Sequence, residues 1–381
     1  MSQILTTSPI MIGEVDLHIT RECDNYCEYC YVAPNNPETK TVVNSCGSLH
    51  GDTKTLKKVI HAIRFIAGAK DLVFVGGDPC KHPDLVSLLE CAKAEGLSVC
   101  VLSNTHTYMK DGGQHVDIAH ITSLFDEIDF TVHGSSPEAH DAFTKRPGSY
   151  ERATENIRRF IKARKNNQSV GIVLNMVPDT IEDLPRIMEN IAGRLQMQPG
   201  LDFFTIQRIA PSGKALENFE KWRIDPALVE RAFDTFEDVR TRCGFETKVC
   251  IDAFPWCAVS KKYWGYLEPL RGGCNWGKPG GVLSALMNGE LQRCALCQNT
   301  LGVNILDLKS PEEFSNFMLT HPVLRAVSER RHLDDKCRNC GLLEQCGGGC
   351  VLATGAGDGD PYFYDKDGSL SVREGHDYLS D

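Results

Sequence analysis

Apolar residues in the first half of the chain follow two alternating patterns, which predict strands and helices in turn. Around Val15, Leu17 and Ile19 every second residue is apolar, as is typical of a strand with one buried face. Short apolar runs predict further strands at 71–75, 98–102, 128–132, 170–174 and 203–206. Between these runs, apolar residues recur at helical spacing and predict helices at 55–69, 84–95, 149–165 and about 181–191.

This alternation predicts an α/β fold with a parallel sheet and crossover helices. Six strand–helix units predict a partial (βα)6 TIM-like barrel rather than a closed barrel of eight units. After Pro211-Ser212-Gly213 the alternation stops, and a helical stretch at 226–240 precedes a cysteine-rich segment. We therefore expect an N-terminal tail at 1–13, a partial barrel at 14–215, a bridging helical region at 216–272, a cysteine-rich domain at 273–352 and an acidic C-terminal tail at 353–381.

Composition adds an excess of cysteine to this picture. The 381 residues include 17 cysteines, and the formal net charge is −10. An acidic chain argues against a nucleic-acid partner, because proteins that bind the phosphate backbone usually carry a basic face. We find no secretory signal and no apolar run of the ~18 residues that span a membrane, so we expect a cytoplasmic protein without a membrane partner. In that compartment, so many thiols are expected to bind metal or run redox chemistry rather than form disulfides.

Three cysteines follow directly on the first predicted strand. Cys23, Cys27 and Cys30 have the spacing Cys-x3-Cys-x2-Cys. A [4Fe–4S] cluster normally takes four cysteines, so a loop with three leaves one iron open to another ligand. A zinc site with a remote fourth ligand is the alternative that the spacing leaves open.

The segment from Thr20 to Tyr31 resembles the signature of radical S-adenosylmethionine (SAM) enzymes. In that family SAM chelates the open iron of a [4Fe–4S] cluster. One electron from the cluster cleaves SAM to methionine and a 5′-deoxyadenosyl radical, which abstracts a substrate hydrogen. The resemblance implies that Cys23, Cys27 and Cys30 hold such a cluster, and that an electron donor such as flavodoxin or ferredoxin serves it.

Other residues match SAM-binding positions of the same family. Tyr29 matches the aromatic position that lies near the adenine. The motif Gly76-Gly77-Asp78-Pro79 resembles the Gly-Gly-Glu-Pro element that meets the SAM amino group, with Asp in place of Glu. Ser103-Asn104 lies where the family often places a ribose contact.

Polar residues also follow the later predicted strands. His133 follows the fourth strand, Asn175 the fifth and Arg208 the sixth. In barrels of parallel strands the catalytic groups lie at the C-terminal strand ends, so we expect these side chains to face the same mouth and to bind SAM or substrate. A polar residue at a strand end is also commonly a turn or cap, and for His133 both interpretations stay open.

A second group of cysteines lies near the end of the chain, at Cys274, Cys294, Cys297, Cys337, Cys340, Cys346 and Cys350. Its two Cys-x-x-Cys pairs are compatible with a zinc ribbon or knuckle. The full spacing, with the run Gly347-Gly348-Gly349, resembles the SPASM extension of radical SAM enzymes, which binds auxiliary [4Fe–4S] clusters. On this resemblance we expect a C-terminal Cys-rich SPASM-type domain.

Carried over by position, the resemblance divides these cysteines between two clusters. Cys274, Cys294 and Cys350 belong to the first, with Cys297 or Cys257 as its fourth ligand. Cys337, Cys340 and Cys346 belong to the second, whose last cysteine is missing here. The carboxylate of Asp358 or Asp360, the His376 ring or water could replace it, or that cluster is absent, so we expect one or two auxiliary clusters.

The remaining cysteines are expected to be mostly small core residues, because free cysteine is among the most buried residue types. Cys91, on a predicted amphipathic helix, and Cys100, in an apolar run, are examples.

The middle of the chain bears on the substrate. The stretches Val132 to Asp141 and Ala210 to Ala215 resemble parts of SPASM enzymes that modify ribosomal peptides. The resemblance favours a maturase that oxidatively crosslinks a precursor peptide. A small-molecule dehydrogenase or epimerase, acting on a sugar, an amino acid or a cofactor precursor, is the alternative, and Cys80 or Cys257 could then return a hydrogen atom. A zinc-binding scaffold without SAM chemistry is a third hypothesis.

The first predicted strand begins near Glu14, so we expect no N-terminal leader-binding domain of the kind that many peptide maturases carry. A separate leader-peptide recognition protein, a leaderless mode or a small substrate would each fit.

Overall fold

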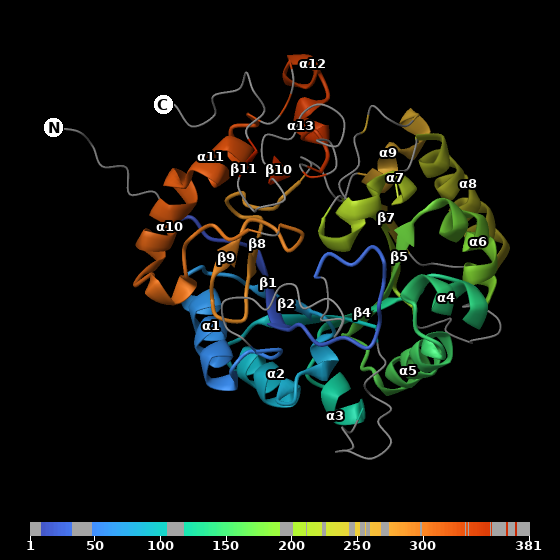
Figure 1. The fold of residues 1–381 in the computed structure, drawn as a ribbon, viewed down its shortest axis with the longest axis horizontal. Coiled ribbons are helices and arrows are strands. Elements are labelled where there is room, and N and C mark those ends of the chain that lie inside the picture. Colours follow the sequence, from blue (N-terminus) through green and yellow to red (C-terminus); the bar gives the residue numbers. More distant parts are fainter. Residues whose placement is uncertain are drawn as a thin grey trace.

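A nine-stranded sheet forms the framework of this computed structural model (Figure 1). The structure describes residues 9–32, 48–104, 118–190, 201–210, 212–222, 226–243, 248–251, 256, 260–267, 274–297, 299–331, 333, 335–350, 352, 363–364 and 370–371. The strand order is β7-β6-β5-β4-β3-β2-β1-β8-β9. The bounds are β1 Glu14–Thr20, β2 Asp71–Gly76, β3 Ser98–Ser103, β4 Glu127–Thr131, β5 Ser169–Met176, β6 Phe203–Arg208, β7 Lys248–Ile251, β8 Val282–Ala285 and β9 Leu291–Gln292. A separate two-stranded sheet consists of β10 (Phe363–Tyr364) and β11 (Leu370–Ser371).

The six predicted strands are β1 to β6, and the expected α/β fold with a parallel sheet is confirmed. All neighbours from β1 to β7 pair in parallel, and at the other end of this sheet β9 runs antiparallel to β8. Two parallel strands lie beyond the predicted six. β7 and β8 have four residues each, too few to give a periodic pattern.

Helices follow most of the parallel strands and lie along the outer side of the curved sheet (Figure 1). Their bounds are α1 Thr53–Phe65, α2 Leu85–Ala94, α3 Ile118–Thr122, α4 Pro137–Thr144, α5 Ser149–Ala163, α6 Pro178–Glu189, α7 Phe219–Trp222, α8 Pro226–Cys243, α9 Trp264–Leu267, α10 Pro311–Thr320, α11 Pro322–Ser328, α12 Asp335–Arg338 and α13 Leu343–Cys346. None of the described helices is both long and apolar enough to cross a membrane.

The two faces of the barrel wall differ in polarity, as β1 illustrates. Val15, Leu17 and Ile19 are at most 1% exposed and belong to the main apolar core, together with the buried faces of α1 and α5. The alternate residues Asp16 and His18 point to the other face because side chains alternate along a strand. The outer face therefore packs against the helices and contributes to the stability of the fold. The inner face carries polar side chains that are available to bind ligands.

The cysteine-rich segment is attached to this sheet by a strand. β8 pairs with the first four residues of β1, from Glu14 opposite Val282 to Leu17 opposite Ala285. The helices α10 and α11, near the β8–β9 side in Figure 1, pack against each other. The predicted boundary at residue 273 thus precedes a segment that continues the barrel sheet, and the domain boundaries remain a prediction.

The outer core gives a stability prediction. Phe204 of β6 is fully buried, and its ring lies 6.1 Å from that of Phe236 of α8. We expect Phe204→Ala to lower the free energy of unfolding by about 3–5 kcal/mol, because it leaves a cavity in the core. Phe65→Ala, at a side chain that is 49% exposed, should change it by less than about 0.5 kcal/mol. Denaturant titration followed by circular dichroism measures both, and equal losses would contradict this placement of the core.

Candidate functional site

The three front cysteines lie in the loop that follows β1. Cys27 is buried, whereas Cys23 and Cys30 are half-buried. The Cys23 sulfur accepts hydrogen bonds from the backbone N–H of Asn25 (3.4 Å) and from the side-chain amide of Asn104 (3.1 Å). Burial raises the pKa of Cys27 to about 12, so this thiol gives up its proton only to a strong positive charge such as a bound metal.

The sulfur atoms are spaced more widely than a single zinc ion requires. Tetrahedral zinc holds its ligands at about 2.0–2.3 Å, which brings donor atoms within about 4 Å of one another. In the part of the chain that the structure describes, one group of three potential ligands has all donor atoms within 4.8 Å, and it includes neither the front nor the C-terminal cysteines. The cysteine groups therefore suit a multi-iron cluster better than a single ion.

A pair of glycines brings the loop after β2 against the cysteine loop. A Cβ at Gly76 would lie 2.2 Å from the carbonyl oxygen of Thr20, and a Cβ at Gly77 would lie 2.3 Å from that of Glu22. The same close approach lets the Gly77 N–H donate to the backbone carbonyl oxygen of Thr20 (2.9 Å). The Asp78 N–H likewise donates to the backbone carbonyl oxygen of Glu22 (2.8 Å). These contacts fix Asp78 relative to the cysteines.

Asp78 is fully buried, and half of its carboxylate lacks a partner. Oδ1 accepts from the backbone N–H of Cys80 (3.0 Å) and from the Ser103 hydroxyl (2.9 Å). Oδ2 is buried and has no hydrogen-bond partner among the described residues. Burial raises the pKa of Asp78 to about 6, against the hydrogen bonds from Cys80 and Ser103. A buried acceptor without a donor suits a ligand with N–H groups, such as the SAM amino group.

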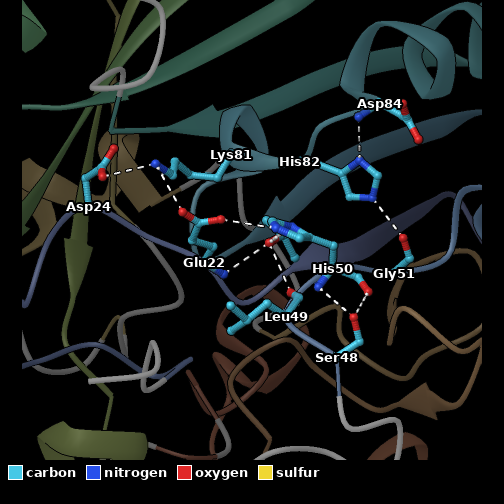
Figure 2. A network of polar contacts seen from close by, with 10 residues as sticks. Glu22, Asp24, Ser48, Leu49, His50, Gly51, Lys81, His82 and Asp84 are labelled. Carbon is cyan, nitrogen blue, oxygen red and sulfur yellow. Dashed lines mark hydrogen bonds and ion pairs between the residues drawn. The ribbon is translucent and has the colours of Figure 1, made fainter. Parts of the chain in front are cut away.

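Figure 2 shows a polar network that ties the cysteine loop to the residues after Asp78. Lys81 belongs to the short 3-10 helix Pro79–Lys81, and its side chain is only 7% exposed. Its Nζ lies 3.1 Å from Asp24 and 3.2 Å from Glu22. Burial lowers the pKa of Lys81, but the two carboxylates outweigh this effect and hold the pKa above its usual value. Lys81 therefore forms ion pairs with both residues that flank Cys23.

Two histidines extend this network to the segment before α1 (Figure 2). His50 Nε2 lies 3.1 Å from Glu22, and His50 Nδ1 lies 2.9 Å from the Thr20 hydroxyl. His82 Nε2 lies 2.9 Å from the carbonyl oxygen of Gly51. Sequence reasoning found none of these contacts, because no local motif joins segments so far apart along the chain.

Tyr29 belongs to an aromatic group at the same end of the barrel. Its hydroxyl and His133 Nε2 are 2.8 Å apart, and its ring lies 4.9 Å from that of Phe143 and 6.3 Å from that of Trp222. Burial, together with His140, holds the pKa of His133 well below its ordinary value, so the ring is neutral at pH 7. Among the described residues, His133 Nδ1 and Trp222 Nε1 are buried without a partner. Trp222 lies in no recognisable motif, so sequence reasoning missed it.

A cavity of about 940 Å³ borders this aromatic group. Its lining includes the rings of His133, Phe143 and Trp222 and charged side chains such as Lys145 and Asp179. This volume lies within the range of about 300–1,000 Å³ that is usual for ligand pockets.

Asn175 and Arg208 lie at the predicted strand ends. Asn175 is the last residue but one of β5 and is 6% exposed, and Arg208 ends β6. The register pairs Arg208 with Met176, next to Asn175. Both residues thus lie at the C-terminal ends of their strands, the end of the barrel at which Asp78 and His133 follow β2 and β4.

Four of the C-terminal cysteines lie close together. Cys294 and Cys297 share a small apolar cluster against which Cys350 packs. The N–H of Cys274 donates to the carbonyl oxygen of Gly349 (3.3 Å), next to Cys350. Burial raises the pKa of Cys294, and the neighbouring Cys297 and Cys274 raise it further. The resemblance assigns Cys274, Cys294 and Cys350 to the first auxiliary cluster, and Cys297 is one of its two candidates for the fourth ligand.

The other three C-terminal cysteines follow closely in sequence. Cys340 is exposed, and its N–H donates to the carbonyl oxygen of Cys337 (3.0 Å). Cys346 is buried, and its sulfur accepts from the N–H of Trp256 (3.4 Å). The alternative ligands Cys257, Asp358, Asp360 and His376 lie outside the described residues, so their roles remain predictions.

Two cysteines outside these groups differ from a simple core residue. Cys80 is buried at the site, and its thiol donates to the Ser103 hydroxyl at 3.2 Å. Cys100 does not pack as the expected core residue. Its sulfur lies 3.8 Å from the Glu127 carboxylate, because it occupies the inner face of β3 while its apolar neighbours face outward.

Comparison with known proteins identifies the class. Residues 17–191 match the Radical SAM superfamily. This stretch begins within β1 and contains β2 to β5, the three-cysteine loop and the Gly76–Asp78 loop. The chain therefore contains a radical SAM domain, and enzymes with this domain use a [4Fe–4S] cluster and SAM.

The similarities extend over nearly the whole chain. It is 23% identical over 369 residues to the AdoMet-dependent heme synthase of Methanosarcina barkeri, covering 93% of this chain and 95% of that protein. It is 24% identical over 353 residues to the PqqA peptide cyclase of Ruegeria pomeroyi, covering 90% of this chain and 83% of that protein. Its fold resembles that of SuiB from Streptococcus suis bound to the precursor peptide SuiA, with a TM-score of 0.65, 14% identity, and coverage of 95% of this chain and 76% of that chain.

The Lys81 contacts give a testable prediction. We expect Lys81→Met to weaken the retention of iron by the front cysteine loop by about 10-fold or more, because loss of a group that orients metal ligands typically has this effect. Iron per chain after anaerobic reconstitution with limiting iron, and the electron paramagnetic resonance spectrum of the reduced protein, measure the change.

Two variants control for this test. Lys81→Arg keeps the charge and should restore most of the iron. Lys93→Met removes a lysine that pairs with Asp126 (2.6 Å) elsewhere in the barrel, and should leave the iron content unchanged. Equal iron in Lys81→Met and wild type would show that Lys81 does not orient the loop.

Proposed function

We propose that the C-terminal end of this barrel binds a [4Fe–4S] cluster and SAM, and that the enzyme modifies a peptide. The observation that carries the cofactor assignment is the unsatisfied, buried Oδ2 of Asp78 beside the Cys23 loop. When bound, the cluster and SAM supply the radical that removes a hydrogen atom from the substrate. Cys23, Cys27 and Cys30 would hold the cluster, and Asp78 would accept a hydrogen bond from the SAM amino group.

The surrounding residues have supporting roles in this proposal. Asn104 and the Asn25 N–H donate to the Cys23 sulfur, and such hydrogen bonds tune the potential of an iron–sulfur cluster. Ser103 holds the Asp78 carboxylate through Oδ1 and leaves Oδ2 for the ligand. The neutral His133 ring fixes the orientation of Tyr29, whose ring would lie near the adenine.

Asn175 and Arg208, at the ends of β5 and β6, are further candidates for contacts to SAM or substrate. The C-terminal cysteines would hold auxiliary clusters. Cys274, Cys294, Cys297 and Cys350 suit one cluster because they already lie together. Cys337, Cys340 and Cys346 would serve a second.

A peptide substrate is supported by two similarities. The R. pomeroyi relative is a PqqA peptide cyclase, and the SuiB structure contains a precursor peptide. The cavity beside His133 and Trp222 would accommodate part of a peptide chain. We propose an oxidative crosslink as the product, a precursor peptide as the partner, and an external electron donor.

Oxidation of a small molecule is the second candidate. The M. barkeri relative, a heme synthase, matches 95% of its own length at an identity close to that of the peptide cyclase. The SAM-handling residues are compatible with either substrate.

Asp78 gives a direct test of the cofactor assignment. We expect Asp78→Asn to weaken SAM binding by about 10- to 100-fold, because a hydrogen bond to a charged group contributes about 1.5–3 kcal/mol. Equilibrium dialysis of cluster-loaded protein with labelled SAM measures the affinity. Asp84→Asn, at an exposed carboxylate bonded to Thr53 (2.5 Å), is the control and should bind SAM normally. An unchanged affinity in Asp78→Asn would remove Asp78 from the SAM site.

The substrate is tested by SAM cleavage. We expect the reconstituted protein, incubated anaerobically with SAM and a reductant, to release 5′-deoxyadenosine, and to release more when its precursor peptide is present. The peptide product should be two mass units lighter for each crosslink, by mass spectrometry. Absence of SAM cleavage would contradict the cofactor assignment. Turnover of a porphyrin-type substrate, with no response to peptides, would favour the second candidate.

A further inference from the structure

The base of the barrel, at the N-terminal ends of the strands, contains an acidic group that the proposed chemistry does not use. Cys100 of β3 lies opposite Glu127 of β4 in the strand register, and Asp129 is the next residue of β4 on the same face. The Cys100 sulfur lies 3.8 Å from Glu127 Oε1. One donor atom from each of these three residues lies within 4.8 Å of the others.

This group has no cationic partner among the residues that the structure describes. Among the described residues, no Lys, Arg or His forms an ion pair with Glu14, Asp16, Glu127 or Asp129. Burial, together with Glu127 and Glu14, raises the pKa of Asp129 to about 8. Burial, with Asp71 and Glu127, raises the pKa of Glu14 to about 7. Like charges gather here, and nothing described neutralises them.

Asp129 is half-buried, and one oxygen of its carboxylate is buried without a partner among the described residues. Its Oδ1 is inaccessible to solvent and has no hydrogen-bond donor among the described residues. The opposing residue of β5 is Gly171, where a Cβ would lie 2.4 Å from that oxygen, so the glycine leaves room for the carboxylate. Asp16, 8% exposed, receives no described hydrogen bond to its carboxylate either. Burying a carboxylate without a partner is costly, so the arrangement points to a missing positive charge.

We propose that Cys100, Glu127 and Asp129 bind a divalent transition-metal ion at the base of the barrel, separate from the cysteine loop at its mouth. One sulfur and two carboxylate oxygens suit zinc or ferrous iron, whereas magnesium and calcium prefer oxygen ligands alone. Zinc takes sulfur at about 2.3 Å and oxygen at about 2.0 Å, so the three side chains need to close slightly around it. A water molecule would complete a four-coordinate site. Glu14 and Glu127 are only half-buried, which leaves a path from solvent.

The probe for this site is Zn²⁺, added anaerobically to the cluster-loaded protein, with unbound metal removed by gel filtration. Wild type should retain one zinc per chain in addition to its iron. Asp129→Asn and Glu127→Gln should bind this zinc more than about 100-fold more weakly, the upper end of the effect of losing an outer-shell partner. Glu90→Gln, at an exposed carboxylate of α2, is the matched control and should keep the zinc. Iron per chain should be the same in all four proteins.

Thermal unfolding separates lost binding from lost folding. Zn²⁺ should raise the Tm of wild type and Glu90→Gln, because a ligand that binds the folded state stabilises it. It should not raise the Tm of Asp129→Asn, which without metal should unfold at or above the wild-type Tm because the amide replaces a carboxyl group whose ionisation burial disfavours. Retention of equal zinc by wild type and both variants would locate the ion elsewhere. Retention of none would show that protons alone neutralise the group, and either result overturns the proposal.

Discussion

The close approach of two backbone segments, Thr20–Glu22 and Gly76–Asp78, is the constraint on which the barrel mouth depends. The carbonyl oxygens of the first segment occupy the space that side chains at Gly76 and Gly77 would need. Only glycine permits this contact, and two backbone hydrogen bonds then lock it. Because Cys23 follows the first segment and Asp78 ends the second, one contact sets the distance between the cysteine loop and the unsatisfied carboxylate. Lys81, three residues further on, reaches back to the same loop.

Local sequence patterns predicted the framework well and the cross-chain contacts poorly. Apolar periodicity reports which side of a strand packs against helices, and it located all six predicted strands. It says little about the inner face, so Cys100 looked like a core residue although it lies beside Glu127. That neighbour depends on the register of β3 against β4, which no local pattern encodes. For the same reason, the hydrogen bond from Asn104 to Cys23 and the position of Trp222 could not be predicted. The glycine pair and the cysteine spacings could be recognised, because each is a continuous motif.

The inner face of the barrel has two ends of different character. The mouth carries sulfur atoms and the Asp78 carboxylate, and the base carries carboxylates without cations. His18, on the inner face of β1 between these ends, is buried, and burial lowers its pKa to about 4, so it is neutral at pH 7. The Tyr31 ring lies edge-on to it at 6.3 Å. Two uncharged rings thus lie between the carboxylates at the base and the cysteine loop at the mouth.

The charges around the cysteine loop also differ in what they can do. Its three carboxylates, Glu22, Asp24 and Glu28, all pair with lysines from other elements. Lys145 and Lys221, on Glu28, are 46% and 56% exposed, and ion pairs so open to water contribute little. Lys81 is 7% exposed and pairs with two carboxylates at once, so removal of its charge would leave Glu22 and Asp24, on either side of Cys23, without this cation. The position of the cysteine loop therefore depends far more on the buried Lys81 than on the exposed Lys145 and Lys221.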